Sequence, residues 1–195
     1  MGGFQRHRRS KLIIANFSGF EADLLRSLAG QLVELLRNEA AVPRDDSADP
    51  FEAMFDFSGP TQAPEDPVLA RLFPTAYPAD EEAAAEFRRF TEGTLRDGKA
   101  DAAITIIDTL EEAGLPTELA EEGLVIDVEL DEPTAETWMR SFTDLRLALA
   151  TRLGVEEGDE AFWYALPDDD ARAQAHDIYE WVGYLQETLV QALTD

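Results

Sequence analysis

Apolar residues recur every three or four positions through much of this chain, and this spacing constrains the fold more than any other feature of the sequence. The pattern is densest over residues 21–38, where six leucines share one helical face: Leu24, Leu25, Leu28, Leu32, Leu35 and Leu36. Ser18, followed three residues later by Glu21, is typical of a capping box at the start of such a helix. We therefore expect helices to supply most of the core.

The same spacing predicts helices over residues 79–95, 101–113 and 133–153, and from Pro167 to the C-terminus. Asp97-Gly98 is expected to interrupt the first two of these, because glycine disfavours the helix interior. Two segments instead have the composition of strands, at residues 11–17 and 124–130. The prediction is a mainly α fold, a helical bundle of about five main helices with a small two-stranded β element, in one domain over residues 1–195.

Charge favours pairing of the two strands. Arg9 and Lys11 lie at the start of the first strand, whereas Asp127 and Glu129 lie on the polar face of the second. Opposite charges on neighbouring strands contribute a few tenths of a kcal/mol up to about 1 kcal/mol. Pairing within one chain and pairing across a dimer both remain open.

Residues 40–77 differ from the rest of the chain because prolines and acidic residues interrupt any periodicity. This long Pro-rich loop also carries aromatic residues, among them Phe51, Phe55 and Phe73. One interpretation is that short helical turns at 50–55 and 67–73 dock on the body. The alternative is a partly disordered recognition segment. Docking is the preferred interpretation.

The net charge of −25, from 41 acidic and 16 basic residues, narrows the possible partners. Nucleic acid and anionic membranes bind through clustered Lys and Arg, so both are poor partners for such a surface. A protein partner with a basic surface fits the charge instead. Residues 1–10 form a basic N-terminal arm, and a DNA-binding regulator fits only if this arm supplies the contact.

Catalytic and metal-binding patterns are missing from the sequence. With no cysteine, the 195 residues offer no thiolate ligand, nucleophile or disulfide. His7 and His176 have no metal-ligand spacing, and the acidic run 168–170 suits a helix N-terminus. We predict no enzyme activity, no cofactor and no metal. A signal peptide and a membrane-spanning stretch are also not seen, so the expected location is the cytoplasm.

The arginines within predicted helices are the most specific candidates for a site. In so acidic a chain, Arg88, Arg89, Arg146 and Arg152 are expected to pair with carboxylates. Arg146 has a second interpretation, as the ligand-binding group of a pocket between helices. The full set of candidate interaction or ligand residues is Arg88, Arg89, Asp144, Arg146, Arg152, Phe51, Phe55 and Phe73.

The run TDLRLALATRLG at residues 143–154 resembles the core motif of an uncharacterised actinobacterial domain-of-unknown-function family. The segments LFPTAY at 72–77 and EFRRF at 86–90 agree in order, and the resemblance covers nearly the whole chain. Thr143 stands where Asn is usual, and Ala150 where Gly is common. The resemblance implies a gene often encoded beside a ClpS-type proteolytic adaptor, and a loose association with regulators. It implies no catalytic residues.

Taken together, the residues favour a non-enzymatic protein-interaction or regulatory module with an acidic surface and possible homodimer formation. The alternative is a small-molecule-responsive regulator with an Arg-lined inter-helix pocket. A DNA-binding regulator or a metal-dependent hydrolase fits less well, because a cationic surface and metal-ligand spacing are both missing.

Overall fold

The computed structural model describes residues 2–38, 59–121, 123–167 and 169–194. These residues form a mainly α fold with a small antiparallel sheet, as predicted. The elements in chain order are β1 (Gln5–Arg6), β2 (Ile13–Ser18), α1 (Gly19–Asn38), α3 (Pro67–Leu72), α4 (Glu81–Glu112), β3 (Val125–Leu130), α5 (Glu132–Leu153), α6 (Glu160–Tyr164) and α7 (Ala171–Thr194).

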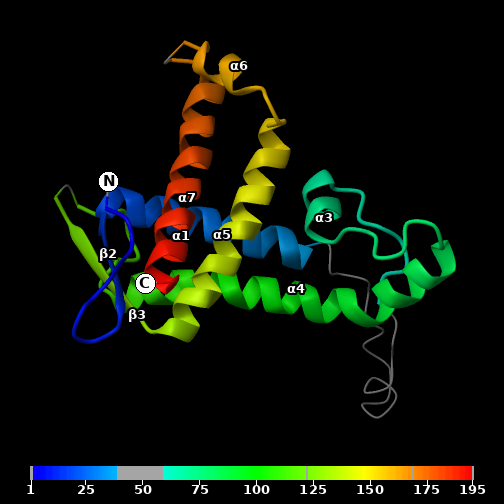
Figure 1. Cartoon of the computed structure of the whole chain (residues 1–195), viewed down its shortest axis with the longest axis horizontal. Helices are drawn as coiled ribbons and strands as arrows, with labels where there is room; N and C mark the ends of the chain where they lie inside the picture. The colour runs from blue at the N-terminus through cyan, green and yellow to red at the C-terminus, as the bar shows by residue number, and fades with distance from the viewer. Residues whose placement is uncertain (1, 39–58, 122, 168, 195) are drawn as a thin grey trace.

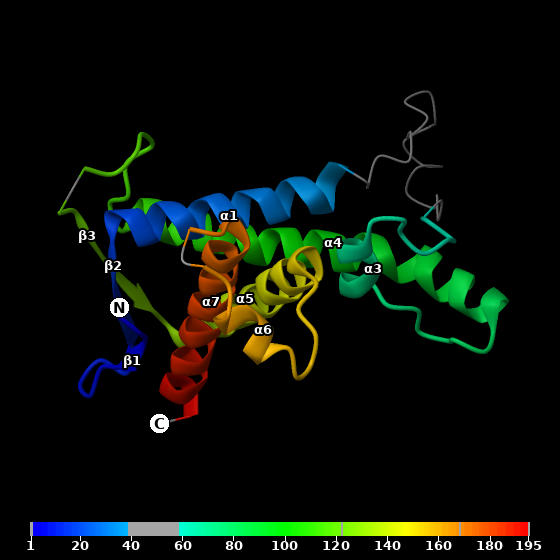
Figure 2. The ribbon, with the colours of Figure 1, turned by 90° about the horizontal axis from the view of Figure 1, so that it is seen from above.

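The long helices form two neighbouring pairs, α1 beside α4 and α5 beside α7, and α5 also packs against α4. Figures 1 and 2 show the α5–α7 pair crossing the α1–α4 pair, with the sheet at one end and α3 toward the other. Leucine-rich and aromatic faces meet where these pairs cross, which places the core there. In the described part of the chain, no helix is both long and apolar enough to cross a membrane.

The two predicted strands do pair within one chain, as β2 and β3. Their inner faces are buried and alternate with exposed positions, as the sequence pattern indicates: Ile13, Ala15 and Phe17 on β2, and Ile126, Val128 and Leu130 on β3. The predicted charge pairing is wrong, because the register sets Asn16 opposite Asp127 and Ile14 opposite Glu129. The Asn16 side-chain amide donates a hydrogen bond to the Asp127 carboxylate.

A third strand, β1, was not expected from the sequence. It covers only Gln5–Arg6 and pairs antiparallel with β2. The Phe4 side chain beside it is buried, and its backbone N–H donates to Thr188 Oγ1 on α7 over 3.1 Å. Within the segment predicted as a basic arm, the exposed arginines are therefore Arg8 and Arg9, which lie in the turn after β1.

Several predicted helix boundaries are confirmed by the hydrogen bonds at the helix ends. The backbone N–H of Ser18 donates to Glu21 Oε2 over 2.8 Å, and that of Glu21 donates to Ser18 Oγ over 3.2 Å, which is a capping box. Asp131 caps α5 by accepting from the Thr134 N–H over 2.9 Å. Gly154 ends α5 with φ 73°, a left-handed conformation that favours glycine.

The expected break at Asp97-Gly98 is wrong, because α4 runs unbroken over 32 residues. Both sides of the glycine are anchored by buried side chains: Arg88, Glu92 and Arg96 on one side, and Ala100, Ala103, Ile106 and Leu110 on the other. A glycine in a helix interior costs only about 1 kcal/mol, less than this packing contributes.

Gly98→Ala is expected to raise the free energy of unfolding by about 0.5–1 kcal/mol, because a Cβ at this position meets no atom within 4 Å. Urea unfolding followed by circular dichroism would measure the change. Gly154→Ala is the matched control, since its positive φ predicts destabilisation instead. A loss of stability in Gly98→Ala would contradict the unbroken helix.

Of the Pro-rich segment the structure describes residues 59–77, and residues 67–72 of this part are helical. The predicted docked turn at 67–73 is confirmed as α3, whose Val68, Leu69 and Leu72 are buried. The predicted turn at 50–55, with Phe51 and Phe55, lies outside the described residues. Farther along, Phe162, Trp163 and Tyr164 belong to the short helix α6, and α7 begins at Ala171 rather than at Pro167.

Candidate functional site

The N-terminal half of α4 buries a stripe of charged side chains, Arg88, Glu92 and Arg96, spaced four residues apart. All three are at most 7% exposed. Arg88 pairs with Glu92 Oε2, and Arg96 donates through Nε and Nη2 to Glu92 Oε1 over 2.9 and 2.7 Å. Residues at i and i+4 share a helix face, so the sequence places the three groups in reach of one another.

This arginine–glutamate stripe holds Phe73, the residue that follows α3. Arg88 Nη2 donates to the Phe73 carbonyl oxygen over 3.2 Å, and the Arg96 guanidinium lies 4.8 Å from the centre of the Phe73 ring. Arg96 Nη1 also donates to the Leu36 carbonyl oxygen over 3.2 Å, near the end of α1. The charges on α4 therefore fix the ends of two other helices.

Two ion pairs extend the network onto α5. Lys99 Nζ lies 2.6 Å from Asp144 Oδ1 and 5.9 Å from the Phe73 ring centre. Arg152 Nη2 lies 2.7 Å from Asp66 Oδ2, and Asp66 caps α3 by accepting from the N–H groups of Val68 and Leu69. The segment around α3 is therefore held from both α4 and α5.

Burial by itself raises the pKa of the Asp66 carboxyl, but the Arg152 hydrogen bond and the backbone N–H groups of Leu69 and Val68 outweigh it. The net effect is a pKa below the usual 3.8. A carboxyl with a lowered folded-state pKa stabilises the fold above its unfolded-state pKa, and this contribution is lost as the pH falls through the folded-state value.

We expect Asp66→Asn to lower the free energy of unfolding at pH 7 by up to about 1 kcal/mol, since asparagine keeps the cap but loses the half-exposed ion pair. The difference from the parent chain should shrink as the pH falls below about 4. Urea unfolding at several pH values would measure it. Asp97→Asn, at an exposed position on α4, is the control. A difference that grows in acid would contradict the assignment.

The structure brings together Arg88, Asp144, Arg152 and Phe73 of the candidates predicted from sequence. Of the others, Arg89 is exposed on α4, Arg146 lies in a separate cleft, and Phe51 and Phe55 are outside the described residues. The sequence reasoning missed Glu92, Arg96, Lys99 and Asp66. The spacing Arg88, Glu92, Arg96 was the available signal, because it places opposite charges one turn apart.

Arg146 lies between α5 and α7 without the carboxylate partner that the sequence led us to expect. Within the described residues, its Nη1 donates to Gln186 Oε1 over 3.0 Å and its Nη2 to the Tyr179 hydroxyl over 3.4 Å, and it forms no ion pair. Its buried Nε has no hydrogen-bond partner. A Cβ on Gly183 would come within 3.2 Å of Nε, so this glycine gives the guanidinium room.

Arg146 lines a cleft of about 590 Å³ formed by α5, α6 and α7. Tyr179 and His176 also line it, and the His176 ring stacks on Trp163 with centroids 4.8 Å apart. Five acidic residues belong to the lining: Glu156, Glu157, Asp159, Glu160 and Glu180. The cleft thus combines Arg146, which is held by neutral partners, with a second cation, Arg71 of α3, and with these carboxylates.

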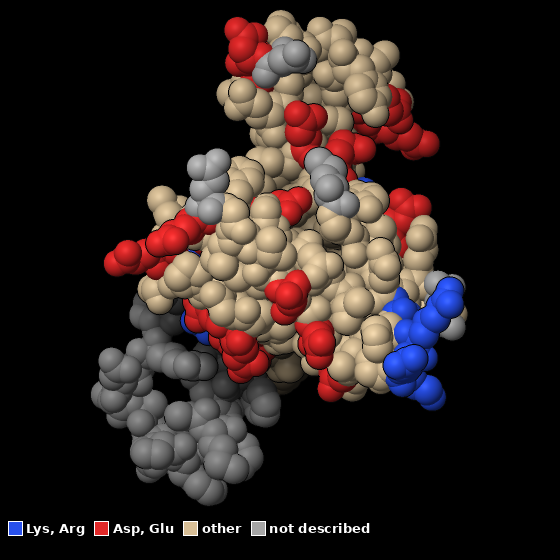
Figure 3. All heavy atoms as spheres, turned by 90° about the vertical axis from the view of Figure 1, so that its left-hand side faces the viewer, with Lys and Arg blue, Asp and Glu red and all other residues tan. Residues whose placement is uncertain are grey.

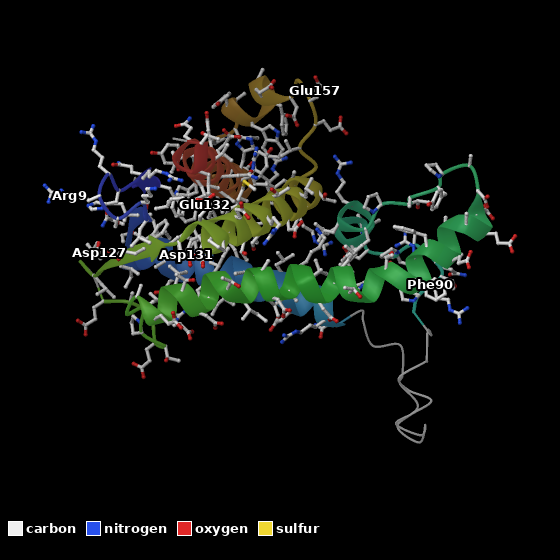
Figure 4. All side chains as sticks on the ribbon, turned by 60° about the horizontal axis from the view of Figure 1, so that its bottom comes forward. Arg9, Phe90, Asp127, Asp131, Glu132 and Glu157 are labelled. Atoms are coloured by element: carbon white, nitrogen blue, oxygen red, sulfur yellow. The ribbon has the colours of Figure 1, made fainter. Side chains whose placement is uncertain are left out.

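The largest group of Lys and Arg on the face of the molecule that carries the sheet lies at one edge, and Asp and Glu are scattered over the rest of that face (Figure 3). The exposed cations there are Arg8, Arg9 and Lys11 of the β1–β2 turn, where Figure 4 labels Arg9. His7 and Leu12 close this turn with a backbone hydrogen bond of 2.8 Å. The basic arm is therefore a short, hydrogen-bonded hairpin tip.

Among the residues that the structure describes, no group of three or more His, Cys, Asp or Glu side chains is placed to hold a metal ion. The buried charges of α4 are paired with one another and with backbone carbonyls, so they join elements of the fold. Fold and site define a mainly helical protein in which a buried ion-pair network anchors a proline-rich segment.

The chain belongs to the family described as Domain of unknown function (DUF2017), which it matches over residues 1–193. The oxidative stress regulator AosR of Mycobacterium tuberculosis is 31% identical to it over 191 residues, covering 89% of this chain and 78% of that protein. AosR of Mycobacterium bovis matches equally. A Mycobacterium leprae protein that also carries the name AosR is 33% identical over 188 residues, with the same coverage. These relatives are actinobacterial, as the resemblance implied. No solved structure matches the chain.

Proposed function

We propose that this protein is a non-enzymatic regulator that acts by binding a protein partner with a basic surface. The observation that carries the proposal is the surplus of carboxylates, 41 acidic against 16 basic residues, far more than internal ion pairs can use. The names of the AosR relatives support a regulatory role. A strongly anionic surface speeds encounter with cationic proteins and disfavours nucleic acid.

The composition also restricts how such a regulator could respond to oxidants. The 195 residues contain no cysteine, so thiol oxidation and disulfide formation within them are excluded. If this chain shares the role that the AosR names describe, any thiol that responds to oxidants lies outside these 195 residues. Regulation would then consist of binding or releasing the protein partner.

Affinity capture from a native lysate tests the proposal. The immobilised chain should retain a basic protein at about 50 mM NaCl and release it at about 500 mM, because screening weakens attraction between surface charges. An unrelated protein of similar isoelectric point serves as the control bait. The captured protein, once purified, should form a complex of defined stoichiometry with the chain. Retention of the same proteins by both baits would overturn the proposal.

A small-molecule-responsive regulator is a second candidate, favoured by the lack of a carboxylate partner for Arg146 in the described structure. A ligand carboxylate or phosphate could accept hydrogen bonds from this guanidinium. Thermal-shift measurements with a panel of metabolite anions would test it, and stabilisation should disappear in Arg146→Ala. Arg140→Ala is the matched control, because Arg140 does not line this cleft and its hydrogen-bond partner among the described residues is Thr137 of its own helix. Equal ligand-induced shifts in melting temperature in both variants would contradict this second candidate function.

A further inference from the structure

The N-terminal half of α4 is inverted relative to an ordinary surface helix. Arg88, Glu92 and Arg96 face the protein and are 7%, 2% and 6% exposed. Phe87 and Leu95, by contrast, are 43% and 48% exposed. A helix on the surface of a globular protein normally buries its apolar stripe and exposes its charges.

The inward stripe has an explanation within the fold, because it holds Phe73 and the end of α1. The outward stripe, Phe87 and Leu95, has no such explanation in the described structure. Burying Phe87 and Leu95 would be favourable, yet α4 turns them to the surface. Figures 1 and 2 show this half of α4 extending beyond the end of α1, with α3 and its flanking segments beside it.

The outward face is broader than the helix alone. Tyr77 is 48% exposed and packs edge-on against Phe87, with ring centroids 5.8 Å apart. Phe90 is 50% exposed, and Figure 4 places it on the projecting part of α4. Gly98 falls on the same side by helical spacing, and a Cβ there would meet no atom within 4 Å. An exposed aromatic face with a glycine beside it allows another backbone to approach closely.

Carboxylates border this face. Glu86, Asp97 and Asp101 are exposed, and none of them forms an ion pair with a described residue. Positions 86, 97 and 101 are eleven and four residues apart, so helical geometry places them along one side of Phe87 and Leu95, the side on which Phe90 also lies. The face therefore presents an apolar strip with an anionic border.

We propose that this α4 face, centred on Phe87 and Leu95, is the docking site for a basic amphipathic helix of the protein partner. This inference rests on the proposed function, because it assumes that the chain binds such a partner. The apolar side of the incoming helix covers the aromatic strip, while its Lys and Arg pair with the carboxylate border. A second copy of this chain fits less well, because it would bring two carboxylate borders and two charges of −25 together.

The probe for this site is a short synthetic peptide of leucine and lysine with the leucines at helical spacing. A peptide of the same composition in scrambled order is its control. Fluorescence anisotropy with the full chain should show tighter binding of the helical peptide, and Phe87→Gln/Leu95→Gln should weaken that binding by about tenfold or more. Val190→Gln, at a 40% exposed position on α7, is the matched variant and should bind as the parent chain does.

Hydrogen exchange should show peptide-dependent protection over residues 81–98. The proposal is overturned if the double variant binds the helical peptide as tightly as the parent chain. It is also overturned if the parent chain self-associates in sedimentation velocity and the double variant does not, because the occupant is then a second copy.

Lysate capture with the Phe87→Gln/Leu95→Gln bait separates this proposal from the proposed function. Loss of the salt-sensitive basic partner from this bait supports the α4 site. If the bait still retains that partner, the proposed function stands and the α4 site fails. If the parent chain itself retains no such partner, the proposed function fails.

Discussion

Glu92→Ala is expected to lower the free energy of unfolding by about 3–5 kcal/mol, because it leaves two buried guanidinium groups without their shared carboxylate. Arg88 and Arg96 both bond to Glu92, and all three side chains are almost fully buried. Chemical denaturation monitored by circular dichroism would measure the loss. Hydrogen exchange should increase most in α3 and in residues near Phe73, which the two arginines hold.

Two further variants separate this effect from a general sensitivity of α4. Asp97→Ala removes an exposed carboxylate from the same helix and should change stability by no more than about 0.5 kcal/mol. The triple variant Arg88→Met/Glu92→Leu/Arg96→Met removes the buried charges together and should recover much of the stability lost in Glu92→Ala. A loss below about 1 kcal/mol in Glu92→Ala would show that water replaces the missing carboxylate.

Phe4→Ala is expected to destabilise the fold by about 3–5 kcal/mol, although Phe4 lies near the N-terminus. Its ring is 4% exposed and sits 5.9 Å from Phe17, 5.8 Å from Trp138 and 6.1 Å from Phe142, measured between ring centroids. The substitution leaves a cavity in the aromatic cluster between the sheet and α5. Urea unfolding followed by tryptophan fluorescence would report both the lost stability and the altered surroundings of Trp138.

The combined variant Arg8→Gln/Arg9→Gln/Lys11→Gln is the control for Phe4→Ala. These three residues lie in the exposed hairpin turn without ion pairs in the described structure, so the change should stay within about 0.5 kcal/mol per position. Equal destabilisation by the two variants would contradict the placement of Phe4 in the core. The same charge variant also tests whether the arm binds DNA. It removes three positive charges and keeps Phe4 in the core, whereas deleting the segment would remove Phe4 as well.

Local signals in the sequence were sufficient for most helices and for the β2–β3 pair. Leucine spacing predicted α1, the Ser18–Glu21 pair its cap, and apolar spacing over residues 133–153 the extent of α5. β1 was missed because a strand of two residues carries no periodic signal, and its position depends on Phe4 reaching a core made by distant residues. The unbroken α4 was not predicted, because the low helix propensity of glycine can be read from the sequence, whereas the packing that outweighs it cannot.

The candidate site shows the same division. The sequence identified Arg88, Asp144, Arg152 and Phe73 as candidate site residues, but it predicted for every helix arginine a carboxylate partner without saying which one. The i,i+4 spacing within α4 could have identified Glu92 as the partner of Arg88. The neutral partners of Arg146, in contrast, lie on α7 and become its neighbours only when α5 and α7 pack together.

The sequence by itself determined the helical class, the sheet-forming segments, the anionic charge and the exclusion of cysteine chemistry, because composition and short-range periodicity act within a few residues. The tertiary structure alone decided which face of α4 turns inward. Hydrophobic periodicity would have buried Phe87 and Leu95, but the contacts of Arg88 and Arg96 with Phe73 and Leu36 reversed that choice. Such contacts join residues far apart in the chain, so they exist only once the helices have packed.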